Sequence, residues 1–358
     1  MSFNGSGVFL INTSGQPVVA GTAISDTVFN DLTADLASGL STCMTKDGQQ
    51  TATANIPMGG FKFTGMGLGL ATTDSARMDN ATCQNICEGR LGSDTPNSGG
   101  GFRTADNSTT VSYYPYKGNK IALYNSTQWV LRSFTTKTIS VPATTSQMYD
   151  VFAYDNAGVV TMETVAWTSD TARATGLTTQ DGVLVKSGDA TRRYIGSFRT
   201  GTVSGQTRDS DAFRYIWNYY NRVPIKMIKT VTSATSWNYT TAVFRQANGD
   251  TANQIDFVYG VAEDPVSIEV VTSVRNTNIQ IIAQTGIGLR STTTDSATIA
   301  PVFIPAVANI QTVNTVKYFD IPGTVGRINA VWLEKSIATG TATWNDIGNG
   351  SISGWYMG

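Results

Sequence analysis

The sequence predicts a mainly β protein, in which a short helical and extended N-terminal module precedes two antiparallel β-sandwich or jelly-roll-like domains. Composition favours this class: charged residues make up 14% of the 358 positions, against about 25% in an average globular protein, while Gly fills 35 positions. Short apolar runs separated by turn residues recur through the chain after residue 110. Alternation such as Val266, Ile268 and Val270 is typical of strands with one buried face.

Ahead of these strands, residues 24–44 have the periodicity of an amphipathic helix. Ser25 or Asp26 can cap its start, and Gly39 lies near its end. The apolar side consists of Ile24, Val28, Phe29, Leu32, Leu36 and Leu40. One helix with a Gly-rich strand gives residues 1–70 little core of their own. Two interpretations stay open: the helix packs on its own domain, or it joins a bundle with other copies of the chain.

Residues 53–66 predict a kinked strand-turn-strand. Pro57 cannot donate to a sheet ladder and holds Ile56 in an extended conformation, because a residue before proline avoids the helical region. Gly59 and Gly60 permit the positive φ angles of a tight turn. Such a run is not a generic linker.

Three strings in this part of the chain carry a family resemblance: GTAISDTVFN at 21–30, LSTCMTKDGQ at 40–49 and TANIPMGGFK at 53–62. They resemble a segment near the N-termini of tail fibres and related virion appendage proteins of tailed bacteriophages. The resemblance implies docking to the virion through the N-terminus. The expected oligomer or attachment interface is the helix stripe, Ile24, Val28, Phe29, Leu32, Leu36 and Leu40, together with Ile56, Pro57, Met58, Gly59, Gly60 and Phe61.

The domain organisation follows from the turn-rich segments. Residues 1–88 form the N-terminal attachment and oligomerisation module, in which Asp74 can cap a second short helix that reaches Cys87. A Gly-, Ser- and Asn-rich linker at 89–110 leads into a central β domain at 111–223 and a C-terminal β-sandwich at 224–358. The two β domains are expected to fold without the first 88 residues.

The central domain is predicted to hold several hairpins and one helix. The first two hairpins turn at Asn125-Ser126-Thr127 and at Asp155-Asn156-Ala157-Gly158. The third, around Asp181-Gly182 and Ser187-Gly188-Asp189, joins residues 183–186 with residues 191–198. The helix is predicted from Phe213, Ile216, Trp217 and Tyr220, which share one helical face, with acids ahead of it and Pro224 at its end.

Composition excludes several classes of function. A net charge of −1 and a pI near 5.5 leave no basic field for nucleic acid. The sequence has no apolar run near the ~18 residues of a membrane span, and residues 1–11 lack the pattern of a signal peptide. We therefore expect assembly in the host cytoplasm and a final location in the virion, without membrane insertion.

Side-chain chemistry predicts no enzyme, no cofactor and no metal. The sequence contains no His and three Cys, so histidine triads and complete zinc sites are excluded. Asp209-Ser210-Asp211 could contribute to a calcium site, but helix capping explains these residues better. A polysaccharide hydrolase would need two carboxylates facing each other across a cleft, a distance that sequence does not give. The candidate surface-binding residues are Trp344, Trp355 and Tyr356, near the C-terminus.

The leading hypothesis is a bacteriophage virion structural protein, a homotrimeric tail fibre or appendage. It would dock by its N-terminus to capsid, portal, collar or tail proteins and adhere to a host surface glycan or protein through the β domains. One alternative is a decoration or head-fibre protein of capsid, collar or tail that binds no receptor. A surface-polysaccharide hydrolase is the third.

Overall fold

The computed structural model describes residues 19–41, 83–92, 106–231, 236–279, 283–299, 307–346, 348 and 350–358. The chain divides into two compact units, Met1–Arg77 and Met78–Gly358. The expected attachment residues Ile56, Pro57, Met58, Gly59, Gly60 and Phe61 lie outside the described residues. Within the described ranges, no helix has the length and apolar character needed to cross a membrane.

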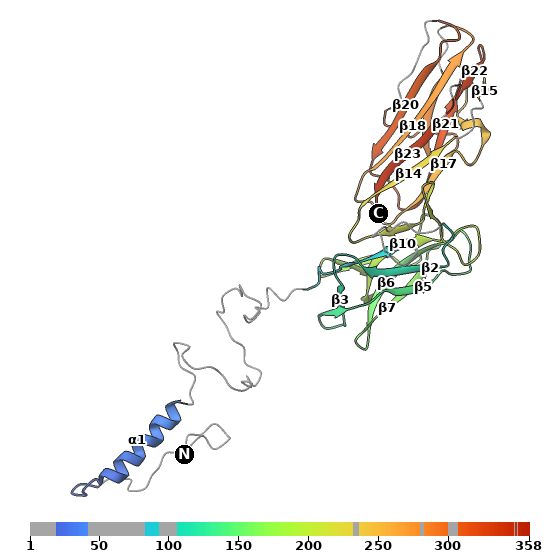
Figure 1. The fold of residues 1–358 in the computed structure, drawn as a ribbon. Helices are drawn as coiled ribbons and strands as arrows, with labels where there is room; N and C mark the ends of the chain where they lie inside the picture. The colour runs from blue at the N-terminus through green and yellow to red at the C-terminus, as the bar shows by residue number, and fades with distance from the viewer. Residues whose placement is uncertain are drawn as a thin grey trace. The chain divides into compact units, whose positions relative to one another are not determined.

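Helix α1, Asp26–Ser41, confirms the helix predicted in the first unit (Figure 1). It is shorter than the predicted 24–44 range. Ser25 is its N-cap, because the backbone N–H of Val28 donates to the Ser25 hydroxyl at 3.2 Å. Asp26 places a negative charge in the first turn, where the helix dipole favours it.

The second unit is built from β-sheets, as the composition predicted. A three-stranded sheet has the order β1 (Gly89–Gly92), β2 (Thr110–Pro115), β5 (Lys137–Ser140). Strands β3 (Lys120–Tyr124) and β4 (Trp129–Ser133) form a hairpin beside it. A six-stranded sheet has the order β7 (Val159–Ala166), β6 (Met148–Asn156), β10 (Asp189–Arg199), β9 (Val183–Lys186), β8 (Leu177–Gln180), with β13 (Ile216–Asn218) also on β10.

Two further six-stranded sheets form a β-sandwich. One has the order β11 (Asp209–Ser210), β12 (Phe213–Arg214), β17 (Gln254–Tyr259), β21 (Gly326–Lys335), β16 (Arg245–Gln246), with β19 (Gln284–Leu289) on β21. The other has the order β14 (Pro224–Thr230), β23 (Ser351–Met357), β18 (Val266–Asn276), β22 (Ala342–Trp344), β15 (Trp237–Tyr239), with β20 (Thr312–Asp320) on β18 (Figure 1). A short 3-10 helix, Ala247–Gly249, follows β16.

The predicted hairpins are confirmed, and their turns show why. Asp181 and Gly182 have φ angles of 50° and 82°, which is the left-handed conformation that a two-residue hairpin loop between β8 and β9 requires. Between β6 and β7, the Asp155 carboxylate accepts a hydrogen bond from the Gly158 N–H at 2.8 Å. Local turn chemistry therefore sets the register of these strands.

Three sequence expectations for this unit are corrected. Residues 83–88 form a turn and a bridge of Cys87 to Ile121 rather than a helix. The predicted helix at 213–220 is strands β12 and β13, which pair with β17 and β10. Ile216 and Trp217, adjacent on β13, are both buried, and a strand buried on both faces cannot be told from a helix by periodicity.

The third correction concerns the predicted linker at 89–110, because its first four residues are the buried strand β1. A Cβ at Gly89 would lie 2.2 Å from the ring of Tyr113, and one at Gly92 would lie 2.9 Å from the ring of Tyr114. The two glycines are therefore needed so that β1 can lie under the aromatic side chains of β2, and they do not mark a linker.

The hydrophobic core crosses the predicted boundary at 223/224. Its largest cluster contains Phe152, Tyr194 and Trp217 from the predicted central domain, together with Phe257 and Trp332 from the predicted C-terminal domain. A second cluster joins Leu91 and Val111 to Val151 and Phe198. Residues 78–358 thus form one compact unit instead of two separate domains.

Candidate functional site

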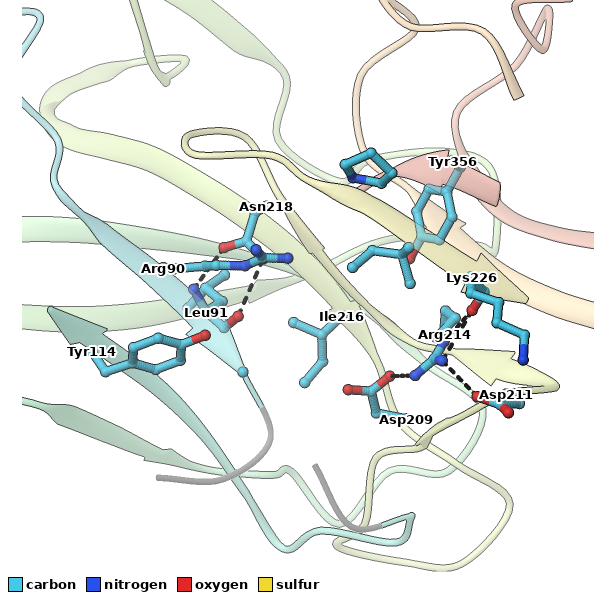
Figure 2. Close-up of a pocket in the computed structure, with 13 residues that line it drawn as sticks. Arg90, Leu91, Tyr114, Asp209, Asp211, Arg214, Ile216, Asn218, Lys226 and Tyr356 are labelled. Atoms are coloured by element: carbon cyan, nitrogen blue, oxygen red, sulfur yellow. Dashed lines mark hydrogen bonds and ion pairs between the residues drawn. The ribbon is translucent and has the colours of Figure 1, made fainter. Parts of the chain in front are cut away.

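A cavity of about 220 Å³ lies in the second unit and is lined by residues of β1, β2, β11–β14 and β23. Figure 2 shows Arg90, Leu91 and Asn218 on one wall, Asp209, Asp211 and Arg214 on the opposite wall, and Ile216 between them. Strands distant in sequence therefore bring charged, amide, phenolic and aliphatic groups around one space.

Arg214 organises one wall of the cavity. The register of the β11–β12 hairpin places Asp209 opposite Arg214, and Asp211 lies in the connecting turn. The guanidinium donates to Asp209 at 2.8 Å and to Asp211 at 3.0 Å. It also donates to the backbone carbonyl of Lys226 on β14, at 3.1 Å from Nε and 3.0 Å from Nη2. These contacts fix a buried cation between two carboxylates.

The opposite wall is held by Arg90 and Asn218. Arg90 Nη2 donates to the backbone carbonyl of Gly358 at 2.8 Å, and its guanidinium lies 5.6 Å from the ring centre of Tyr116. Asn218 brackets Leu91: its side-chain oxygen accepts from the Leu91 N–H at 2.6 Å, and its amide nitrogen donates to the Leu91 carbonyl at 3.1 Å. Strand β1 is thereby tied to β13.

Two buried tyrosines, Tyr114 and Tyr356, complete the lining. Burial raises the pKa of both phenols, and the nearby Asp209 carboxylate raises that of Tyr356 further, so both stay protonated and can donate hydrogen bonds. The Tyr356 hydroxyl is buried and has no hydrogen-bond partner in the part of the chain that the structure describes. Its ring lies 4.9 Å from the ring of Phe257.

The charge pattern limits what this wall can do chemically. A glycosidase holds its two carboxylates on either side of the bond to be cleaved. Asp209 and Asp211 instead hold the Arg214 guanidinium between them. Among the described residues, no cluster of three or more Cys, Asp or Glu side chains could hold a metal ion.

Of the three aromatic residues predicted to bind at the surface, Trp355 alone is exposed. Trp344 and Tyr356 have no exposed surface, whereas Trp355 is 39% exposed. The prediction for Trp344 and Tyr356 is therefore wrong as stated. Successive residues of a strand point to opposite faces, so Tyr356 enters the sandwich core while Trp355 faces outward. Trp344 packs with Val274, its paired residue on β18, in a small buried cluster.

Trp355 belongs to a row of side chains across the outer face of its sheet. The register pairs Trp355 with Lys226 on β14 and with Ser267 on β18, and Ser267 pairs with Phe319 on β20. Paired residues share a face, so Phe319, 52% exposed, and Trp355 lie on the same side, two strand spacings or about 10 Å apart. Lys226 connects this row to the cavity wall.

Helix α1 carries the other predicted interface. Ile24 lies just before the helix, and the stripe continues on it through Val28, Phe29, Leu32, Leu36 and Leu40. Phe29 and Leu40 are more than half exposed, and Val28 and Leu32 are half-buried. The apolar face of α1 is therefore largely uncovered by the described residues of its own unit.

Sequence reasoning missed Arg90, Arg214 and Asn218. Arg90 lay in the predicted linker, while Arg214 and Asn218 lay in the predicted helix. Asp209 and Asp211 were considered, but as helix caps or calcium ligands rather than as partners of Arg214. One available signal was the register of a short hairpin, in which Asp209 and Arg214 face each other across the turn.

Comparisons with known proteins give no family. No family model matches the chain, and no curated protein matches it. Among solved structures, the VP2 subviral particle of infectious bursal disease virus aligns with a TM-score of 0.27 and 11% identity, over 69% of this chain and 64% of that chain. An insecticidal delta-endotoxin from Bacillus thuringiensis aligns with a TM-score of 0.23 and 9% identity, over 71% and 50%. None of these alignments assigns a function.

Proposed function

We propose that this protein is a virion structural protein, a tail fibre or related appendage that assembles through its N-terminal unit and presents the β unit to a host cell surface. The resemblance of residues 20–66 to appendage attachment segments supports the virion assignment. The exposed apolar face of α1 supports assembly, and it is the single observation that carries the proposal.

The stripe on α1 spans a continuous arc of the helix. With about 100° per residue, Val28, Leu32, Leu36, Phe29 and Leu40 fall within an arc of about 120°. Asp31 lies off this arc. In water, such an arc is unfavourable unless another surface covers it. Packing against the same arc of other copies covers it with closed symmetry, and a trimer fits the appendage resemblance.

The assembly part of the proposal is tested on the full chain. Light scattering coupled to gel filtration should give three times the 38.2 kDa monomer mass. The double variant Leu36→Lys, Leu40→Lys should lower the mass to that of the monomer, whereas the control Asp31→Lys should leave the trimer intact. A monomeric wild-type protein would contradict the assembly role of α1.

The location and adhesion parts need the virus that encodes the chain. An antibody against the β unit should label purified particles in electron micrographs, and a labelled fragment 78–358 should coat cells of the host. Particles that carry the protein while the fragment binds no cells would indicate a decoration protein. Particles without label would contradict the whole proposal.

A further inference from the structure

We propose that the cavity between Arg90 and Arg214 binds one pyranose ring of an uncharged carbohydrate. The inference rests on the proposed adhesive function in one respect, that the sugar would belong to a host surface glycan. A cavity of about 220 Å³ has room for several water molecules. That volume suits a single sugar ring with its hydroxyl groups, and not an extended peptide.

The cavity lining carries charges of both signs, which favours an uncharged ligand: Asp209 and Asp211 against Arg90, Arg214 and Lys226. Asp209 and Asp211 would repel a phosphate or carboxylate placed against Arg214, whose guanidinium already binds both of them. A cationic ligand would be repelled by Arg90, Arg214 and Lys226. A hydroxyl group both donates and accepts, so a polyhydroxylated ring can satisfy carboxylate oxygens and guanidinium N–H groups together.

The Tyr356 hydroxyl supplies the observation that points to a bound molecule. The hydroxyl is fully buried and no described residue accepts its proton, and the Tyr356 side chain is one of those that line the cavity. Native proteins rarely leave a buried hydroxyl without a partner. The raised pKa of this phenol keeps the hydroxyl a donor at neutral pH. A sugar oxygen at this end of the cavity would complete the missing hydrogen bond.

The aliphatic side chains of the cavity lining suit the C–H groups on the faces of a sugar ring. Ile216 lies between the two polar walls in Figure 2, and Ile225 of β14 also borders the cavity. A pyranose presents C–H groups on its faces and hydroxyls around its edge. Aliphatic side chains flanked by a few well-placed polar groups are the usual composition of a small-molecule site.

The test uses the full chain and five separate probes: the methyl pyranosides of glucose, galactose, mannose, rhamnose and N-acetylglucosamine. Saturation-transfer NMR should detect at least one of them, with a Kd in the millimolar range. Inorganic phosphate should bind at least tenfold more weakly and should not displace the sugar. Binding of phosphate with displacement of the sugar, or binding of none of the five, would overturn the proposal.

Substitutions of cavity residues test whether the sugar binds in this cavity. Tyr356→Phe should weaken binding of the sugar that gives an NMR signal at least tenfold. The Tm should stay equal or rise, because the phenol has no described hydrogen-bond partner to lose. Tyr318→Phe, a buried phenol on β20 outside the cavity, is the matched control and should not change Kd. Asp211→Asn should also weaken binding. Unchanged affinity in both Tyr356→Phe and Asp211→Asn would place the sugar elsewhere and overturn the proposal.

These outcomes are separable from those of the proposed function. If the cavity binds no sugar, the result of antibody labelling of virus particles still decides the virion assignment by itself. If the protein binds a sugar but the antibody labels no particles, the cavity assignment stands and the virion assignment is wrong.

Discussion

Arg90 and Gly358 are 268 positions apart, and they are joined by a buried hydrogen bond of 2.8 Å from the guanidinium to the backbone carbonyl. The bond fastens β1, from the predicted linker, to the residue that follows the last strand. Gly358 in turn exchanges two backbone hydrogen bonds of 3.0 Å with Val223, just before β14. Arg90 also lines the cavity, so the stability of this junction bears on the proposed site.

Arg90→Met should therefore destabilise the second unit. The substitution removes a hydrogen bond from a charged donor and leaves the Gly358 carbonyl without it, which we expect to cost about 2–3 kcal/mol. Urea unfolding of the fragment 78–358 measures the change. The control is Arg132→Met, which removes an ion pair to Asp155 from an arginine whose side chain is 32% exposed, and it should shift the midpoint less. Equal shifts in the two variants would show that the junction is not important for stability.

The fold also predicts where the chain can be cut. A fragment 78–358 should unfold in one cooperative transition. A fragment 110–358 lacks β1 and with it Leu91, which is 2% exposed, so it should lose about 3 kcal/mol or more. Circular dichroism during thermal unfolding gives both results. Equal Tm values for the two fragments would restore 89–110 as a linker.

The hairpin turns and helix α1 could be predicted from the sequence. Asp181-Gly182 and the Asp155 turn specify hairpins within a few residues, and the structure has those hairpins. Ser25 and the apolar spacing after it likewise specify α1. In each case the decisive interactions lie between near neighbours in the chain.

The candidate site could not be predicted from the sequence, because its contacts join residues that are distant in the chain. Arg90 meets Gly358, Asn218 meets Leu91, and Arg214 meets the carbonyl of Lys226. None of these pairings leaves a local pattern. The glycines of β1 look like a flexible segment until the rings of β2 are placed over them.

Trp344 and Trp355 provide a direct test of which C-terminal aromatic residues form the core. Trp344→Ala should cost about 3–5 kcal/mol, because the side chain is fully buried and leaves a large cavity. Trp355→Ala should cost about 1 kcal/mol or less, since its side chain lies on the outer face. Chemical unfolding of both variants in the 78–358 fragment gives the comparison. Similar losses would mean that the two faces of this sheet are assigned incorrectly.

Cys87 should be chemically inert in the folded protein. Burial raises the pKa of its thiol, and the sulfur lies 3.2 Å from the hydroxyl of Tyr113. Since the thiolate is the reactive form, iodoacetamide should modify Cys87 far more slowly than the half-buried Cys83. Peptide mass spectrometry after timed alkylation measures both rates, with urea-unfolded protein as the control. Faster modification of Cys87 would show that β1 and β2 open readily.

Glu334 should make stability fall as pH rises. The carboxylate is fully buried on β21, where it accepts hydrogen bonds from Trp237 at 2.5 Å and Arg245 at 2.8 Å. Burial outweighs these partners and raises its pKa above the ordinary value of 4.5. Above pH 4.5, the folded protein therefore holds this proton more tightly than the unfolded chain does, and that contribution to stability is lost as pH rises through the raised pKa.

The variant Glu334→Gln isolates this effect, because glutamine does not titrate. Other carboxyl groups change the stability of both proteins alike, so the informative quantity is the free energy of unfolding of the wild type minus that of the variant. Measured by urea unfolding from about pH 4 to about pH 8, this difference should decrease with rising pH. A difference that increases with pH would mean that the ion pair with Arg245 outweighs burial, and that the folded state holds Glu334 ionised more readily than water does.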